Sequence, residues 1–338
     1  MRSRGLGDVY KRQVWKAFAD ANAASLAMAN GDLDWSNLMI GDPANNFVAK
    51  DAVDPANRYF ILEEGPNMGI LAMNIDRKPF DDPNVRKAIS MAINRDQVVM
   101  IGEGGVVGPT DVTGLTDFYR SWKVDDPAAL ADWATYNVEK ANELLDAAGL
   151  ARGADGIRVA DGKPMQYEVM VLPAPNWIAD LQIVAENLKE VGIEIAVTPN
   201  PNFPEWLETQ ATGNYDMHFS IIDGNATPYR FYRQTMSSDL YAPEGEFAQG
   251  NYTRYAGGAA DELLTQFAAA TDLEQQKAIA LDLQAVFAAE APAVPLVPLG
   301  GMGLVNTTRF TGFPTAENYY ASAQPLSLIH ISEPTRPY

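Results

Sequence analysis

Helix and strand patterns alternate along most of this chain, and this alternation is the feature that most limits its fold. Asn137–Ala148 and Trp177–Val191 each carry apolar residues on one helical face and are each followed by a glycine. Single apolar strands are expected at Met165–Leu172, Ile193–Val197 and Asp216–Ile222. Strands that alternate singly with helices are typical of layered domains, so we expect an α/β or α+β fold.

Turn and capping residues set the limits of the other expected elements. Asp81 or Asp82 can cap a helix that has Pro83 at its first position. The residues after Asp223 are expected to form a loop. The remaining elements are an alanine-rich helix at Trp15–Asn30, strands at Tyr59–Glu63 and Met68–Ile75, helices at Pro204–Thr212, Ala259–Ala270 and Leu273–Ala289, and an extended run at Val294–Leu299.

Composition excludes several classes of function. The chain of 338 residues has 25 Lys and Arg against 44 Asp and Glu, and such an acidic surface repels nucleic acid and anionic lipid. With no cysteine, disulfides, thiol catalysis and cysteine-ligated metals are excluded. No apolar run approaches the roughly 18 residues that a membrane span needs.

The two ends differ in character from the rest of the chain. GDVYKRQ resembles a translation of a transposon mosaic-end adapter, and LSLIHISEPTR resembles a translation of its reverse complement. We therefore interpret Met1–Gln13 and Leu326–Tyr338 as adapter-derived scars and leave them out of the fold prediction. On this interpretation the gene product extends beyond the N-terminal end, so a signal peptide is not expected in this chain.

Several motifs, in order, resemble one known family. The most specific is NIDRKPFDDPNVRKAISMAINRDQVV (Asn74–Val99), followed by YNVEKANELLDAAGL, AENLKEVGIEIAV, GNYDMHFSIIDG and NYTRYAGGAADELL. Together these pieces cover about Asp32–Pro325 and resemble the bacterial extracellular solute-binding proteins of family 5. The resemblance implies a periplasmic-binding-protein-like fold of type II, with two lobes joined by a hinge. It also implies binding of oligopeptides, dipeptides, nickel chelates or oligosaccharides for an ABC importer.

The resemblance suggests a division of the chain. The apolar segments Leu71–Ile75 and Val294–Leu299 fit two crossings of a hinge. We expect 14–75 to be a remnant of the first lobe with the first crossing, 76–293 to be the second lobe, and 294–325 to be the second crossing and return. The first lobe is then incomplete. The family further implies a monomer, either periplasmic or lipid-tethered, that docks on ABC permease subunits.

Asp223 is the first candidate for ligand binding. It follows the strand MHFSIID, where peptide-binding members of the family place an aspartate that pairs with the ligand's amino terminus. A desolvated ammonium needs a charge-assisted hydrogen bond of this kind. The alternative is an Asp-Gly turn that caps its own backbone. Pro228 and Tyr229 follow, which departs from the peptide binders.

Aromatic and amide residues form a second group of candidates. Aromatic planes can stack on sugar rings or engage amines, and amides can orient polar groups. The ligand-binding prediction includes Trp177, Tyr229, Tyr232 and Asn225. Trp206 and Phe231 belong to the same aromatic group, with packing in the core or hinge as the alternative for every member. Arg230 and Arg233 could orient polar groups, with solvated surface as their alternative.

Nothing in the sequence indicates catalysis or a cofactor. His218 is a lone histidine within a strand, and HExxH, GxSxG and P-loop motifs are absent. We expect no enzyme, no metal and no cofactor. The main alternative is an oligosaccharide binder of the same family, and a glycoside hydrolase with a carboxylate pair is a further rival.

Overall fold

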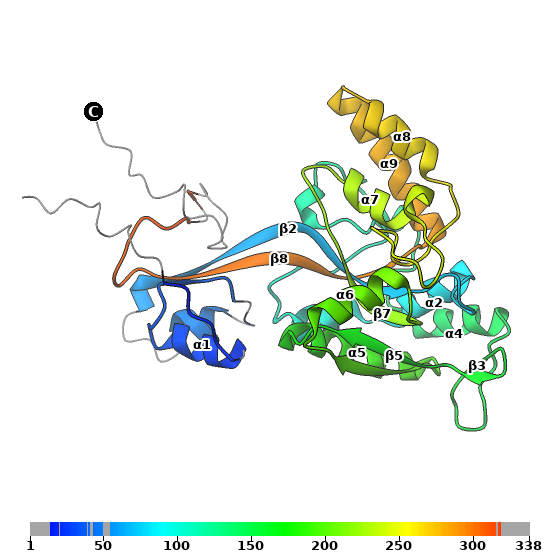
Figure 1. Ribbon diagram of the computed structural model, residues 1–338, viewed down its shortest axis with the longest axis horizontal. Coiled ribbons are helices and arrows are strands. Elements are labelled where there is room, and N and C mark those ends of the chain that lie inside the picture. The colour runs from blue at the N-terminus through cyan, green and yellow to red at the C-terminus, as the bar shows by residue number, and fades with distance from the viewer. Residues whose placement is uncertain are drawn as a thin grey trace, which may run out of the picture. The chain divides into compact units, whose positions relative to one another are not determined.

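The computed structural model describes residues 14–19, 21–38, 40, 43–49, 55–315 and 317–318. The chain divides into a first unit, Met1–Glu63 with Gly301–Tyr338, and a second unit, Glu64–Gly300. Both appear as ribbons in Figure 1. The adapter-like segments predicted at Met1–Gln13 and Leu326–Tyr338 lie outside the described residues.

The described elements are the following. The strands are β1 (Trp35–Ser36), β2 (Arg58–Met73), β3 (Val159–Ala160), β4 (Lys163–Pro164), β5 (Gln166–Val171), β6 (Glu194–Pro199), β7 (Met217–Ile222) and β8 (Val294–Asn306). The α-helices are α1 (Ala21–Ala29), α2 (Pro83–Ala92), α3 (Arg95–Gln97), α4 (Val138–Ala147), α5 (Pro175–Glu190), α6 (Phe203–Thr212), α7 (Tyr229–Met236), α8 (Asp261–Ala269) and α9 (Leu273–Glu290). Shorter turns of helix include η4 (Val98–Gly102), η5 (Asp117–Tyr119) and η7 (Ser238–Leu240).

The sheet of the second unit is mixed. Its strands follow the order β8-β2-β7-β5-β6, with β5 parallel to both β6 and β7 and with β2 antiparallel to β7. Trp177 of α5 packs on Phe219, and Trp206 of α6 packs on His218. Adjacent residues of a strand point to opposite faces, so α5 and α6 cover opposite faces of the sheet. The α/β prediction is confirmed.

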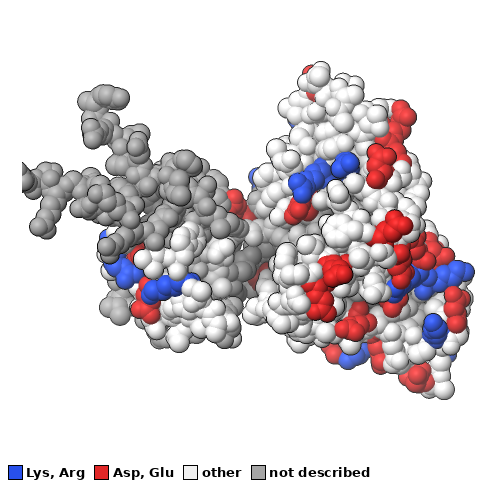
Figure 2. Space-filling model, in the orientation of Figure 1, with Lys and Arg blue, Asp and Glu red and all other residues white. Residues whose placement is uncertain are grey.

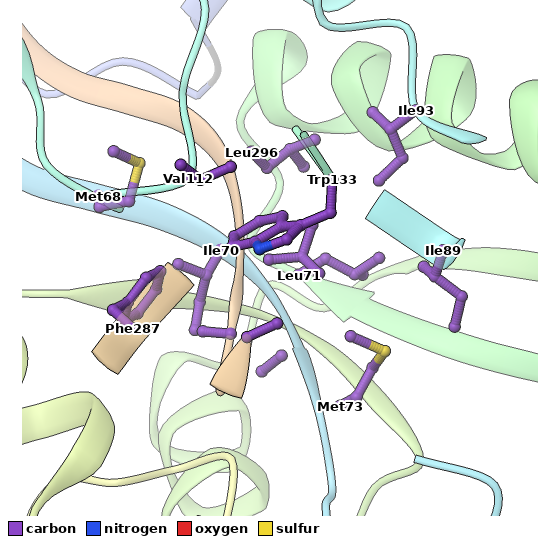
Figure 3. Close-up of a cluster of buried hydrophobic side chains, with 14 of the residues drawn as sticks. Met68, Ile70, Leu71, Met73, Ile89, Ile93, Val112, Trp133, Phe287 and Leu296 are labelled. Atoms are coloured by element: carbon purple, nitrogen blue, oxygen red, sulfur yellow. The ribbon is translucent and has the colours of Figure 1, made fainter. Parts of the chain in front are cut away.

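The core of this unit is built on β2 and β8. Figure 3 shows Ile70 and Leu71 of β2 among side chains from helices and loops, with the ring of Trp133 beside them. The Trp133 ring is 1% exposed, and its Nε1 donates a hydrogen bond of 2.7 Å to the carbonyl of Ala288. The apolar run at Val294–Leu299, predicted to be extended, is the first part of β8, and most of its residues are buried despite its prolines.

Local signals account for most helix starts. Asp82 caps α2 by accepting a hydrogen bond from the Asn84 amide, as predicted, and Asp272 caps α9 in the same way. The two strands predicted at Tyr59–Glu63 and Met68–Ile75 form one continuous strand, β2. The segment after Asp223, predicted to be a loop, is a helix from Tyr229 onward, α7. Burial of the apolar face of α7 stabilises this helix.

The first unit joins segments from both parts of the chain. Trp35 of β1 pairs with Val305 of β8, and its ring meets Phe313 edge to face. Arg309 Nε lies 2.7 Å from Asp34 Oδ1. The alanine-rich helix predicted at Trp15–Asn30 is shorter, running over Ala21–Ala29. No helix in the described ranges of either unit is both long and apolar enough to cross a bilayer.

Candidate functional site

Three parallel strands end at one edge of the sheet in the second unit. Because β5, β6 and β7 run in the same direction, the segments that follow them leave from this carboxyl edge. The segment after β5 carries Trp177, and the segment after β7 carries Asp223 and Asn225. Ligands of open α/β sheets bind at such an edge, where the connections of neighbouring strands diverge. The fold thus brings together two parts of the predicted site.

Asp223 is exposed and carries one ion pair. Its Oδ2 lies 3.0 Å from Arg230 Nη2, and the two side chains are 53% and 47% exposed. A pair this open to water contributes little to stability, about 0–1 kcal/mol. A ligand that offers its own cation can therefore displace the guanidinium at small cost. Arg230 is exposed, in line with the interpretation as solvated surface, and it also pairs with Asp223.

Tyr252 joins this group from a distant loop. Burial raises the pKa of its phenol, and the nearby carboxylate of Asp223 raises it further, while Gln210 and Arg230 act in the opposite direction. The hydroxyl is thus protonated at neutral pH and can donate a hydrogen bond. In the sequence, Tyr252 stands out only as part of the motif NYTRYAGG. No local pattern marks it, since only the tertiary fold places it near β7.

The loop after β7 is held rigidly at its backbone. The Gly224 amide donates to Asn67 Oδ1 at 2.8 Å. Tyr119 Oη accepts from the Asn225 amide at 2.9 Å and donates to the Asn225 carbonyl at 2.7 Å. A Cβ on Gly224 would lie 2.1 Å from the carbonyl oxygen of Pro66. Close approach of two backbones, anchored by these bonds, fixes the position of Asp223.

The other predicted site residues differ in accessibility. Asn225 is exposed, but its Oδ1 accepts from the Ala226 amide at 2.8 Å. Trp177 is half-buried, and its ring centroid lies 5.3 Å from that of Phe219. Tyr229 is half-buried and stacks on Phe267. The structure therefore leaves part of Trp177 and Tyr229 open to solvent.

Tyr232 lies in the core, apart from this group. The side chain is 0% exposed, its hydroxyl donates to the Thr113 carbonyl at 2.9 Å, and its ring meets Phe231 and Phe287. The ring faces inward because it lies on the buried face of helix α7. The sequence predicts a loop here, and a loop has no such face. Within this structure Tyr232 cannot touch a ligand at the carboxyl edge.

Replacing Tyr232 by Phe is expected to change stability and not binding. Loss of the buried hydrogen bond to Thr113 should lower the free energy of unfolding by about 1 kcal/mol. Urea denaturation measures this change. If Tyr232→Phe instead lowered the affinity for a ligand without changing stability, Tyr232 would contact the ligand.

His218 is a structural residue of β7. It is 0% exposed, its Nδ1 lies 3.0 Å from Ser220 Oγ, and burial lowers its pKa to about 3. The ring is therefore neutral at physiological pH. Within the described part of the chain, no group of three or more His, Cys, Asp or Glu residues is arranged to hold a metal ion.

Comparison with known proteins identifies the family. The model of bacterial extracellular solute-binding proteins, family 5 middle, matches residues 8–242. The di/tripeptide-binding protein 3 of Pseudomonas aeruginosa is 23% identical over 244 residues, covering 72% of this chain and 42% of that protein. A glutathione-binding protein of Shigella flexneri is 22% identical over 308 residues, covering 84% of this chain and 52% of its own length.

Solved structures share the fold. A periplasmic oligopeptide-binding protein of Thermotoga maritima superposes with a TM-score of 0.77 at 23% identity, covering 91% of this chain and 58% of that one. A second structure of that protein, with mannohexaose bound, gives a TM-score of 0.76 at 23% identity over 90% and 57% of the two chains. The chain spans about half the length of the relatives it matches. The matching family model covers well over half of the sequence, and the chain belongs to the bacterial extracellular solute-binding proteins of family 5.

Proposed function

We propose that this chain is part of the substrate-binding subunit of an ABC importer and that it captures an oligopeptide-like solute. The observation that carries the proposal is Asp223, an exposed carboxylate on a rigid loop whose partner, Arg230, is itself half exposed. The ammonium of a peptide would replace Arg230 at this carboxylate. Tyr252 and the open face of Trp177 would contact the first residues of the peptide.

The family supports a mechanism without catalysis. The curated relatives described above are named as binding proteins for di- and tripeptides and for glutathione. We propose that the second unit corresponds to the second lobe, and that the solute shifts the protein to a closed form that docks on a membrane permease. We place the protein outside the cytoplasm as a monomer, either free in the periplasm or lipid-tethered.

Charge also favours this class of partner. Acidic side chains lie at many places on the face shown in Figure 2, in line with 44 Asp and Glu against 25 Lys and Arg. Such a surface repels polyanions and attracts cationic groups. A peptide with a free amino terminus fits this field better than nucleic acid does.

The test is a double-mutant cycle on the proposed contact. Asp223→Asn keeps the shape of the side chain and removes its charge, so peptide affinity should fall about 10- to 100-fold, the value of one charge-assisted hydrogen bond. Acetylating the amino terminus of the same peptide should cause an equal loss. The two changes together should cost no more than either alone. Isothermal titration calorimetry gives these affinities.

The matched control is Asp239→Asn, which removes an exposed carboxylate of η7. It should leave affinity unchanged. Equal affinities of Asp223→Asn and the unaltered chain for the free peptide would refute the role of Asp223.

An oligosaccharide is the second candidate ligand. Its support is the Thermotoga maritima structure with mannohexaose bound, together with the partly open rings of Trp177 and Tyr229. A thermal-shift screen against oligopeptides, mannohexaose and cello- or xylo-oligosaccharides separates the two. Stabilisation by sugars alone would replace the peptide proposal. Release of new reducing ends from those sugars would instead reveal a hydrolase.

A further inference from the structure

Two carboxyl groups lie buried against each other beside the first turns of α5. Glu103, just after η4, is 3% exposed, and Asp180 of α5 is 0% exposed. Burial, followed by the proximity of Glu103, raises the pKa of Asp180 from its ordinary 3.8 to about 9. Both oxygens of Asp180 lack any other hydrogen-bond partner. Two neighbouring buried carboxylates disfavour double ionisation, so the pair is most stable while it keeps a proton.

The backbone at the end of η4 lies directly against the Asp180 carboxyl group. A Cβ on Gly102 would lie 1.8 Å from Asp180 Oδ1, so the backbone of η4 presses directly on the carboxyl group. Asn176 Nδ2 donates to the other side of the pair, to Glu103 Oε1, at 2.9 Å. The proton therefore links three segments of the chain: the residue after η4, the first turn of α5 and the second turn of α5.

Nearby charged groups are engaged elsewhere. Among the elements that pack on α5, η4 has no ionisable side chain. The remaining charged residues on those elements and on α3 are engaged away from the pair or exposed. Arg86 donates to the carbonyls of Phe80 and Ala291, Glu194 accepts from Gln166, and Arg95 donates to Ser90 and Thr110. Lys87 is attracted by Glu290, and Asp96 is exposed. On α5 itself, Glu186 pairs with Lys189, well beyond Asp180 in the helix.

We propose that Glu103 and Asp180 share one proton and act as positioning residues, holding Asn176 and Trp177 at the carboxyl edge of the sheet. Asn176 is bonded to Glu103 and precedes Trp177 in the first turn of α5. Loss of the proton places two negative charges in a buried site, which pushes η4 and this turn apart. The consequence for ligand binding rests on the proposed function, whereas the shared proton does not.

The sign of the pH effect follows from the raised pKa. The unfolded chain releases the Asp180 proton near pH 4, and the folded chain keeps it to about pH 9. Stability should therefore decline with rising pH across this window, by up to about tenfold in the folding equilibrium constant per pH unit. Below this pH window the protonated pair makes its full contribution to the free energy of unfolding, and above the window that contribution is lost.

The experiment compares the full chain with Asp180→Asn in urea denaturation from pH 5.5 to 8.5. The side-chain amide of an asparagine can donate to Glu103 at any pH in this range. The folding equilibrium constant of the variant should therefore depend on pH less steeply, by about one proton, which is about tenfold per pH unit. Glu103→Gln should produce the same change from the other side and serves if the first variant fails to fold. Glu208→Gln, an exposed carboxylate of α6, is the matched control and should keep the original slope.

A second measurement tests positioning. The segment 98–107 contains the hydrogen bond from the Gly105 amide to the Val99 carbonyl. Between pH 6 and 9, amide exchange in this segment should accelerate by more than the intrinsic chemical rate does. This extra acceleration is expected in the unaltered chain and not in Asp180→Asn. Equal stability slopes in Asp180→Asn and the unaltered chain would overturn the shared proton. Different slopes with unchanged exchange would overturn the positioning role. Neither readout needs a ligand, so a failure of the peptide proposal leaves both outcomes decisive.

Discussion

Replacing Arg95 by Met should lower the free energy of unfolding by about 3–5 kcal/mol, among the largest single losses that this fold offers. The guanidinium is 4% exposed and bonds to five acceptor sites. It donates to the carbonyl and the hydroxyl of Ser90, to Thr110 Oγ1, and to the carbonyls of Ala134 and Pro295, at 2.7–3.1 Å. Methionine fills much of the volume but donates none of these five hydrogen bonds, and the carbonyls of Pro295 and Ser90 keep only the Thr110 hydroxyl and the Ile93 amide as donors.

Urea denaturation measures the loss, and two variants control for charge and shape. Arg95→Lys keeps the cation but lacks the fork that serves several carbonyls at once, so it should recover only part of the stability. Lys163→Met removes an exposed cation of β4 and should change stability by less than about 0.5 kcal/mol. A cost below about 1 kcal/mol for Arg95→Met would show that the bonds add little beyond their desolvation.

The second large effect is expected at Gly224. An alanine Cβ there would lie 2.1 Å from the Pro66 carbonyl oxygen and 2.5 Å from Tyr119 Oη, so the loop must move. The movement breaks the bonds to Asn67 and Tyr119, and the free energy of unfolding should fall by about 2–4 kcal/mol. Because Asp223 precedes this glycine, peptide affinity should fall by at least about tenfold in the same variant.

The matched control for this effect is Gly108→Ala. Its nearest neighbour would be Asp117 Oδ2 at 3.9 Å, which is ordinary contact, so stability should hold or rise slightly. Denaturation and calorimetry on both variants give the two quantities. Unchanged peptide affinity in a folded Gly224→Ala variant would mean that the position of Asp223 does not depend on this close approach.

The predicted site shows where sequence reasoning reached its limit. Asp223 and Trp177 each follow a predicted strand, and the structure places both at one edge of the sheet because β7 and β5 are parallel neighbours. Tyr232 is predicted to bind ligand from a loop after Asp223, whereas α7 turns its ring into the core. Tyr252 carries no local signal, since its place beside Asp223 depends on a loop far along the chain.

The sequence by itself determined the elements and the family. Apolar periodicity, capping residues and glycine stops are local, so α4, α5, β6 and β7 could be located closely. The tertiary structure alone decided which side chains meet. Gly224 against Pro66, Arg95 against Pro295 and Glu103 against Asp180 join residues distant in the chain, and their burial sets their energies. Burial depends on the whole packed arrangement, which no local pattern of residues encodes.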